Sequence, residues 1–359
     1  MSYDAVLLLG FGGPEAPDEV RPFLERVTAG RGIPPERLEE VGRHYVTLGG
    51  VSPINAQNRT LRAALEAALA ERDHPIPVVL ANRNSPPFVK DVLAELARDG
   101  AHRLLALATS AYSSYSSCRQ YRQDVGAPLA DIAGLDVVKV PPFFDLPGFG
   151  EAEAEVLVPV LAEPGRHPYI LVTTHSIPMS MARTSGPEDG WPADPGTPGR
   201  YVSQHVAVAE AAVKLAAHRA GVEVPAWRLV FQSRSGPPGM PWLEPDVNDV
   251  LAELAAAGVR DVVIAPMGFL SDHVEVVWDL DTQAAATAAA LGIRFTRIPT
   301  ISTHPAFVGG LADLLIRHLD STTPRPPSPG ELCHGNCCPL QSRPGAPFDD
   351  RPSIPGVVA

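Results

Sequence analysis

Residues 5–15 read AVLLLGFGGPE, and this stretch sets the pattern that decides the fold of the chain. Five apolar residues run directly into a glycine-rich turn, and a segment with helical spacing follows at residues 17–29. A short continuous apolar run bounded by turn residues is typical of a strand buried on both faces of a parallel sheet. The stretch therefore predicts a strand, a loop and a helix, in that order.

The same unit recurs along the chain. Further apolar runs lie at residues 77–80, 104–107, 137–140, 169–172, 229–231, 262–265 and 295–298. Segments with helical spacing alternate with them, at residues 55–72, 87–99, 151–161, 202–220, 246–257, 275–291 and 305–319. This alternation predicts an α/β protein with parallel sheets and crossover helices. Eight strands fit either one barrel or two open sheets of four, and a proline-rich junction at residues 141–147 favours two domains.

The composition excludes several classes of function. The 359 residues carry 29 basic and 41 acidic side chains, a formal charge of −12, with no run of four basic residues. A nucleic-acid binder needs clustered positive charge, and a membrane-spanning helix needs about 20 apolar residues in a row. The first residues also lack the cationic region of an export signal. We therefore expect a cytoplasmic protein with no nucleic-acid partner and no integral membrane segment, and a monomer because no extended apolar face is evident.

Residues 321–359 break the repeating pattern. Nine of the 39 prolines fall in this stretch, which resembles a linker or an extended arm. However, three of the four cysteines lie within it, in the sequence CHGNCC at 333–338, and the fourth is Cys118. Four thiolates suit either zinc or an iron–sulfur cluster, although the paired spacing of most zinc sites is missing, and a reducing cytoplasm disfavours a disulfide.

Polar side chains follow the fifth and seventh apolar runs, and ligands of open α/β sheets bind beyond the carboxyl ends of the strands. His175 comes directly after the fifth run, where an imidazole that titrates near neutral pH can accept a proton. After the seventh run, a helix beginning near Asp272 would place Glu275 and Asp279 on one face. Carboxylates beside an imidazole suit a hydrated divalent cation. The structural alternatives are a hydrogen-bonded histidine and an acidic helix start.

Taken in combination, five motifs resemble those of the ferrochelatase family, whose members insert ferrous iron into a porphyrin in haem synthesis. They are LGFGGPE at 9–15, GGVSP at 49–53, THSIP at 174–178, FQSR at 231–234 and GFLSDHVE at 268–275. The resemblance covers residues 5–319. It implies two similar Rossmann-like domains, each a four-stranded parallel sheet flanked by helices in the class II chelatase fold. Their expected bounds are 1–145 and 146–320, followed by the tail at 321–359.

The resemblance also implies the roles of individual residues. His175 and Glu275 match the catalytic pair that meets the ferrous iron, and Asp279 and Asp281 match an acidic path leading to it. A porphyrin must lose two poorly acidic pyrrole protons as it gains the metal, so a base and a distorting pocket are both needed. The resemblance leaves His175 with either of two roles, proton abstraction or metal delivery.

Within the family, the cysteines and the tail are similar to an actinobacterial type that acts on coproporphyrin III. This implies a 2Fe-2S cluster held by Cys118, Cys333, Cys337 and Cys338. The porphyrin-binding candidates are Phe11, Arg31, His44, Ser52 and Tyr121, with Tyr112 and Tyr115 as competitors for the place of Tyr121. Several relatives of this type carry a tyrosine where this chain has Phe11, so a phenolate ligand to iron is missing at that position.

Three alternative functions remain open from the sequence. A closely similar enzyme would act on protoporphyrin IX instead of coproporphyrin III. A non-catalytic haem- or metal-binding protein would use the same fold and the same His175 and Glu275 for binding alone. A chelatase for cobalt or nickel is the third, because imidazole and carboxylates do not by themselves select iron.

Overall fold

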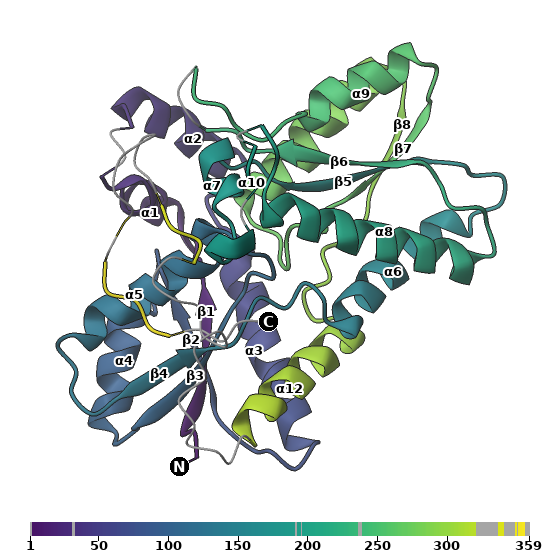
Figure 1. The fold of residues 1–359 in the computed structure, drawn as a ribbon. Coiled ribbons are helices and arrows are strands. Elements are labelled where there is room, and N and C mark those ends of the chain that lie inside the picture. The colour runs from purple at the N-terminus through teal and green to yellow at the C-terminus, as the bar shows by residue number, and fades with distance from the viewer. Residues whose placement is uncertain are drawn as a thin grey trace.

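The computed structural model describes residues 2–30, 33–190, 192–194, 196–235, 239–320, 337–340, 349 and 351–355. Its strands form two four-stranded parallel sheets (Figure 1), in the orders β2-β1-β3-β4 and β6-β5-β7-β8. The strands are β1 (Ala5–Gly10), β2 (Val78–Asn82), β3 (Arg103–Ala108), β4 (Asp136–Lys139), β5 (Tyr169–His175), β6 (Trp227–Gln232), β7 (Asp261–Ala265) and β8 (Arg294–Arg297). The second sheet repeats the strand order of the first. This confirms the expected fold of two similar parallel sheets.

The apolar runs form strands because both faces of each sheet are covered. Along β1 every residue is buried, and Val6 and Leu8 face one layer of the core while Leu7 and Leu9 face the other. The register places Leu7 beside Val79 of β2 on one side and an alanine of β3 on the other. A strand with water on one face would alternate apolar and polar residues, and β1 does not.

The described α-helices include three that the periodicity did not predict. The α-helices are α1 (Val20–Thr28), α2 (Pro35–Thr47), α3 (Ile54–Ala70), α4 (Val89–Arg98), α5 (Gln120–Leu129), α6 (Pro147–Leu161), α7 (Met179–Arg183), α8 (Arg200–Ala220), α9 (Val247–Ala256), α10 (Val274–Val276), α11 (Ala285–Ala290) and α12 (Pro305–Leu319). Short 3-10 helices lie at η1 (Pro17–Glu19) and η3 (Glu188–Gly190), and π-helices at η2 (Tyr115–Arg119) and η4 (Val277–Ala284). The new helices are α2, α5 and the short α7. The single helix expected at residues 275–291 is divided into α10, η4 and α11. None of the described helices has the length and apolar character needed to cross a membrane.

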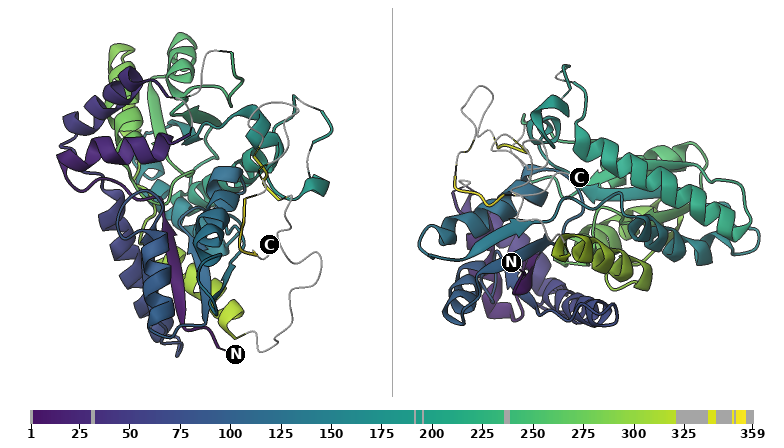
Figure 2. Two further views of the ribbon diagram at one scale, coloured as in Figure 1. Left: turned by 90° about the vertical axis from the view of Figure 1, so that its left-hand side faces the viewer. Right: turned by 60° about the horizontal axis from the view of Figure 1, so that its bottom comes forward.

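Two helices join the halves of the molecule. Helix α12 follows β8 of the second sheet, yet it packs against α3 of the first domain and against α6 (Figures 1 and 2). At the crossing of α6 and α12, a Cβ atom on Gly148 would lie 2.2 Å from the carbonyl oxygen of Ala306, so the close approach requires glycine. One cluster of buried side chains contains residues of both sheets and of both helices, including Leu8, Phe149 and Phe307. The two halves therefore share a hydrophobic core.

The last described residues of the tail, 351–355, lie against the first domain. The Ile354 N–H donates to the Arg122 carbonyl, and the Arg122 guanidinium donates back to the Ile354 carbonyl at 2.7 Å. The N–H of Lys139, the last residue of β4, donates to the carbonyl of Pro355 at 3.0 Å. On α5, a Cβ atom on Gly126 would lie 2.7 Å from the Cα of Ser353. These contacts hold the tail against α5 and β4.

Candidate active site

His175 and Glu275 lie together at the carboxyl edge of the second sheet. His175 is the last residue of β5, and Glu275 lies in α10, beyond the loop that follows the neighbouring strand β7. The His175 Nε2 atom is 3.5 Å from an oxygen of Glu275, and about a third of the imidazole remains exposed. The other ring nitrogen, Nδ1, contacts the carbonyl oxygen of Ser176. A carbonyl only accepts hydrogen bonds, so Nδ1 carries the hydrogen and Nε2 is the atom presented to Glu275.

The surroundings of His175 favour its protonated form. Burial opposes the charge, but the hydrogen bond and charge of Glu275, the Ser176 carbonyl and the charge of Asp279 outweigh it, and the pKa of His175 is raised above 6.5. A carboxylate is therefore in place to stabilise the imidazolium form of His175.

Asp279 extends this group, one turn further along the helix from Glu275. Burial raises the pKa of Asp279 from 3.8 to about 6, against the hydrogen bond from Ser233, and the charge of Glu275 adds to the increase. The Ser233 hydroxyl donates to Asp279 Oδ2, and Gln232 Nε2 lies 3.3 Å from the same oxygen. Ser233 has a left-handed backbone with φ of +61°, which is uncommon for a residue with a side chain and is often found at functional sites.

The structure does not bring Asp281 to this group. Both Asp281 oxygens accept from the guanidinium of Arg297, at 2.8 and 2.9 Å, and Arg297 also lies 3.1 Å from Asp272. Residues two apart on a helix point to nearly opposite sides, so Asp279 and Asp281 cannot both face His175. Ser233 and Gln232 are not among the predicted site residues, although both lie in the motif FQSR at 231–234.

Two further side chains interact with the charges of the pair. Burial lowers the pKa of His273, which also interacts with the charges of Glu275 and His175, so this imidazole is neutral. The ring of Phe269 lies edge-on to it at 5.4 Å. Tyr45 of α2 is buried, and burial and the charge of Glu275 raise the pKa of its phenol. These neutral groups border the His175 and Glu275 pair.

His44 is the predicted porphyrin-binding residue that contacts the opposite domain. Its ring stacks on Trp278 of η4, with the centroids 4.1 Å apart and the planes 10° from parallel. Burial lowers the pKa of His44, which keeps the stacked imidazole neutral. The stack therefore joins α2 of the first domain to the same π-helix that carries Asp279.

Two of the other predicted porphyrin contacts, Phe11 and Tyr121, lie beside Arg83. The Arg83 guanidinium lies 5.8 Å from the ring of Phe11 and 4.0 Å from the ring of Tyr121. Phe11 is partly buried and packs edge-on against Phe23, while Tyr121 is 4% exposed. Ser52 is also 4% exposed. A Cβ atom on Gly13 would lie 2.6 Å from the Cβ atom of Ser52. Arg31 lies outside the described residues.

The competing tyrosines have other contacts. The Tyr112 hydroxyl donates to the carbonyl of Met267, beyond β7, at 2.8 Å. The Tyr115 hydroxyl lies 3.4 Å from an oxygen of Asp349 in the tail and contacts Arg351. Tyr112 therefore joins the two domains, and Tyr115 contacts the tail.

Comparisons with known proteins identify the family. The family model described as Ferrochelatase matches residues 3–319. This chain belongs to the ferrochelatase family. A protein of Propionibacterium freudenreichii named "Coproporphyrin III ferrochelatase" is 47% identical, over 100% of this chain and 99% of that protein. One of Leifsonia xyli with the same name is 49% identical, over 94% of this chain and 91% of that protein.

A solved structure shows a similar fold. "SirB from Bacillus subtilis with Fe3+" has a TM-score of 0.51 and 11% identity, over 89% of this chain and 96% of that one. At this identity the likeness concerns the fold alone. Together with the ferrochelatase family match, it agrees with the expected chelatase architecture, and the match confirms that the chain is a metal chelatase enzyme.

The cysteines of this ferrochelatase family member come from two distant parts of the chain. Cys118 of η2 is buried, as are Cys337 and Cys338, while Cys333 lies outside the described residues. The sulfur atoms of Cys337 and Cys338 are 3.9 Å apart, which is too far for a disulfide of about 2.05 Å. Within the described ranges, no three His, Cys, Asp or Glu side chains form a group able to hold a metal ion.

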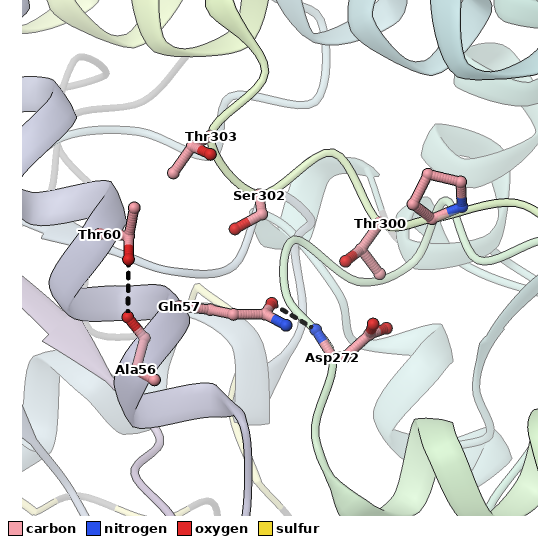
Figure 3. A pocket seen from close by; sticks show the side chains of 8 residues that line it. Ala56, Gln57, Thr60, Asp272, Thr300, Ser302 and Thr303 are labelled. Atoms are coloured by element: carbon pink, nitrogen blue, oxygen red, sulfur yellow. Dashed lines mark hydrogen bonds between the residues drawn. The ribbon is translucent and has the colours of Figure 1, made fainter.

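A pocket of about 350 Å³ lies between α3 and the segment that follows β8 (Figure 3). Its lining residues are Ala56, Gln57, Thr60, Asp272, Pro299, Thr300, Ser302 and Thr303. The Gln57 side-chain oxygen accepts from the N–H of Asp272 at 2.9 Å, which joins the two domains at this point. The lining includes none of the predicted site residues, so this pocket is separate from the group of His175, Glu275 and Asp279.

Proposed function

We propose that the protein inserts ferrous iron into coproporphyrin III, releasing two protons, as a step of haem synthesis. The observation that carries the proposal is the approach of His175 Nε2 to Glu275 at 3.5 Å, with Asp279 one turn further along the helix. The relatives named for coproporphyrin III that cover nearly the whole chain support this choice of porphyrin.

His175 is the group we assign to proton abstraction. Its Nε2 atom faces Glu275, and its raised pKa makes the imidazole a better acceptor for a proton taken from a pyrrole nitrogen. Glu275 stabilises the imidazolium that forms. The carboxyl of Asp279, with a pKa of about 6, is a second group able to take up a proton, or to offer oxygen to the incoming iron once it is ionised.

The test follows the Soret band of the purified protein under anaerobic conditions, with ferrous iron and either coproporphyrin III or protoporphyrin IX. We expect iron insertion with coproporphyrin III, and its loss in His175→Ala. His74→Ala is the matched control, because His74 lies far from the site and pairs with Asp320. No insertion with either porphyrin would refute the proposal. Faster insertion into protoporphyrin IX would refute the choice of substrate but not the enzyme class.

We also propose that Cys118, Cys333, Cys337 and Cys338 hold a 2Fe-2S cluster. Two thiolates bound to one tetrahedral metal at about 2.3 Å lie roughly 3.8 Å apart, and the sulfurs of Cys337 and Cys338 are separated by 3.9 Å. The Gly186 N–H lies 3.0 Å from the Cys338 sulfur, the type of hydrogen bond that tunes cluster thiolates.

The position of the tail also supports the cluster. Arg119, the residue after Cys118, donates to the carbonyl of Cys337 at 3.3 Å, so the described tail segment lies beside the internal cysteine. When bound, the group would supply a covalent link between the tail and η2. We assign it no step in iron insertion.

The visible absorption spectrum of the purified protein, with iron and sulfide analysis, tests the cluster. We expect Cys338→Ser to lose both the absorption and part of the thermal stability. Zinc in place of iron and sulfide would favour the alternative tetrathiolate site. An unchanged spectrum in Cys338→Ser would rule out this ligand set.

We further propose that the enzyme acts in the cytoplasm as a monomer. The acidic charge of −12 and the lack of a membrane-spanning helix among the described residues are consistent with this. Light scattering of the purified protein gives the oligomeric state, and a mass of twice 38.1 kDa would contradict the proposal.

A further inference from the structure

A buried chain of hydrogen bonds lies directly behind His175. Thr174 Oγ1 is 2.9 Å from His205 Nε2 and 2.9 Å from the Tyr201 hydroxyl oxygen. The Tyr201 hydroxyl donates to the carbonyl of His175 at 3.0 Å, and His205 Nδ1 is 2.6 Å from the carbonyl of Tyr201. Thr174, Tyr201 and His205 are each at least nine-tenths buried. The proposed chemistry uses none of these three side chains.

The hydrogens of this chain can be assigned by counting. His205 Nδ1 faces a carbonyl, which only accepts, so Nδ1 carries the hydrogen. Burial lowers the pKa of His205 to about 3, so the imidazole is neutral and its Nε2 accepts from Thr174. The only hydroxyl hydrogen of Thr174 is then used, and its oxygen can only accept from Tyr201. The single hydroxyl hydrogen of Tyr201 is therefore shared between Thr174 Oγ1 and the carbonyl oxygen of His175.

The peptide group that follows His175 is contacted on both sides. Its carbonyl accepts from Tyr201, and its N–H, which belongs to Ser176, donates to the carbonyl of Gln232 at 2.8 Å. The carbonyl of Ser176 in turn accepts from His175 Nδ1. The direction of the imidazole toward Glu275 therefore depends on a peptide plane that is held on both sides.

The hydrogen-bonded group of Thr174, Tyr201 and His205 also contacts the loop that leads to Glu275. A Cβ atom on Gly268 would lie 2.2 Å from Thr174 Oγ1, so Thr174 packs directly on the backbone beyond β7. Tyr112 of the first domain stacks on His205 with the centroids 3.5 Å apart, and its hydroxyl donates to Met267. One buried group of side chains thus contacts both segments that carry the catalytic pair.

We propose that Thr174, Tyr201 and His205 are positioning residues that set the separation of His175 and Glu275. The inference rests on the proposed function, because it concerns the geometry of that pair. A loss of the hydroxyl of Thr174 leaves His205 Nε2 without its donor and releases the hydrogen of Tyr201 from its shared position. A small misplacement of a catalytic group slows turnover more than it weakens substrate binding.

Neighbouring threonines of β5 provide a matched pair of variants. Thr173 and Thr174 are both fully buried, but Thr173 Oγ1 has no hydrogen-bond partner among the described residues. We expect Thr174→Val to lower kcat for iron insertion about tenfold, with the KM for coproporphyrin III changed less than twofold. Thr173→Val should keep both values, and Thr174→Ser, which retains the hydroxyl, should restore most of kcat.

A second measurement does not depend on turnover. Binding of Co2+ to the porphyrin-free protein, followed by visible absorption, should weaken several-fold in Thr174→Val and stay unchanged in Thr173→Val. Melting temperatures of all variants show that each is folded at the assay temperature. If the wild type inserts no iron, the proposed function fails, while the Co2+ series still tests the positioning. Wild-type kcat and Co2+ affinity in Thr174→Val, or equal losses in Thr173→Val, would overturn the inference.

Discussion

Replacing Glu153 with glutamine should make the stability of the protein less sensitive to pH. Glu153 lies on α6, is 1% exposed and is surrounded by the core shared by both sheets. Its Oε1 atom has no hydrogen-bond partner within the described part of the chain. Burial raises the pKa of this carboxyl from 4.5 to about 8. The folded protein therefore keeps Glu153 protonated at neutral pH, whereas the unfolded chain ionises it.

The sign and size of the effect follow from the two pKa values. A carboxyl with a higher pKa in the folded state contributes its full stability below pH 4.5 and loses it as the pH rises to about 8. Each pH unit in this window costs about 1.4 kcal/mol, so the wild type loses about 3 kcal/mol between pH 4.5 and pH 7 through this group. An amide does not ionise, so Glu153→Gln should not show this loss.

Urea unfolding of wild type and Glu153→Gln at about pH 5, 7 and 8 measures the difference. The free energy of unfolding of Glu153→Gln should rise relative to that of the wild type as the pH rises. A constant destabilisation by the amide would not change this trend. Glu155→Gln on the same helix is the control, because that side chain is 43% exposed. Parallel stability curves for wild type and Glu153→Gln would show that the carboxyl is solvated or paired, and would refute the reasoning.

Three further perturbations test other parts of the structure. Asp279→Asn should remove a rise in the iron-insertion rate centred near pH 6, because the wild-type carboxyl ionises there; a pH–rate profile that keeps this rise would assign it to another group. Gly126→Val should displace the tail, since its Cβ would lie 2.7 Å from the Cα of Ser353, and limited proteolysis should then cut the tail faster than in Gly150→Val, where nothing lies within 4 Å. Tyr112→Phe should lower the free energy of unfolding by about 1–3 kcal/mol, because the buried carbonyl of Met267 loses its donor, and a smaller change in urea unfolding would contradict this.

The sheets could be predicted from the sequence because strands buried on both faces have continuous apolar runs. The run at residues 5–9 is apolar at every position, and every residue of β1 is buried. Helix α2 is also visible in the sequence, since Leu38, Val41 and Tyr45 have helical spacing, although residues 35–47 lie outside the predicted helices. The pairing of His175 with Glu275 follows from two adjacent parallel strands, whose carboxyl ends must meet at one edge.

Other features of the site depend on contacts that the local sequence does not record. The change from α-helix to π-helix at η4 decides where Asp279 and Asp281 point, and Arg297, sixteen residues from Asp281, holds the second of them. The burial of Tyr121 beneath Arg83 likewise comes from tertiary packing. The network behind His175 includes His205, which lies on a helix thirty residues away and has no motif around it.

The crossing of α6 and α12 has a mechanical consequence. The chain passes from the first half to the second through α6 and returns through α12, and the glycine contact at Gly148 brings the two helix backbones together. Rotation of one half against the other would have to displace both helices and open the shared core, so α6 and α12 resist such a rotation. By contrast, α1 and α2 are held by a small separate cluster that includes Phe23 and Val274, the residue before Glu275. We therefore expect the amide hydrogens of α1 and α2 to exchange faster than those of α6 and α12.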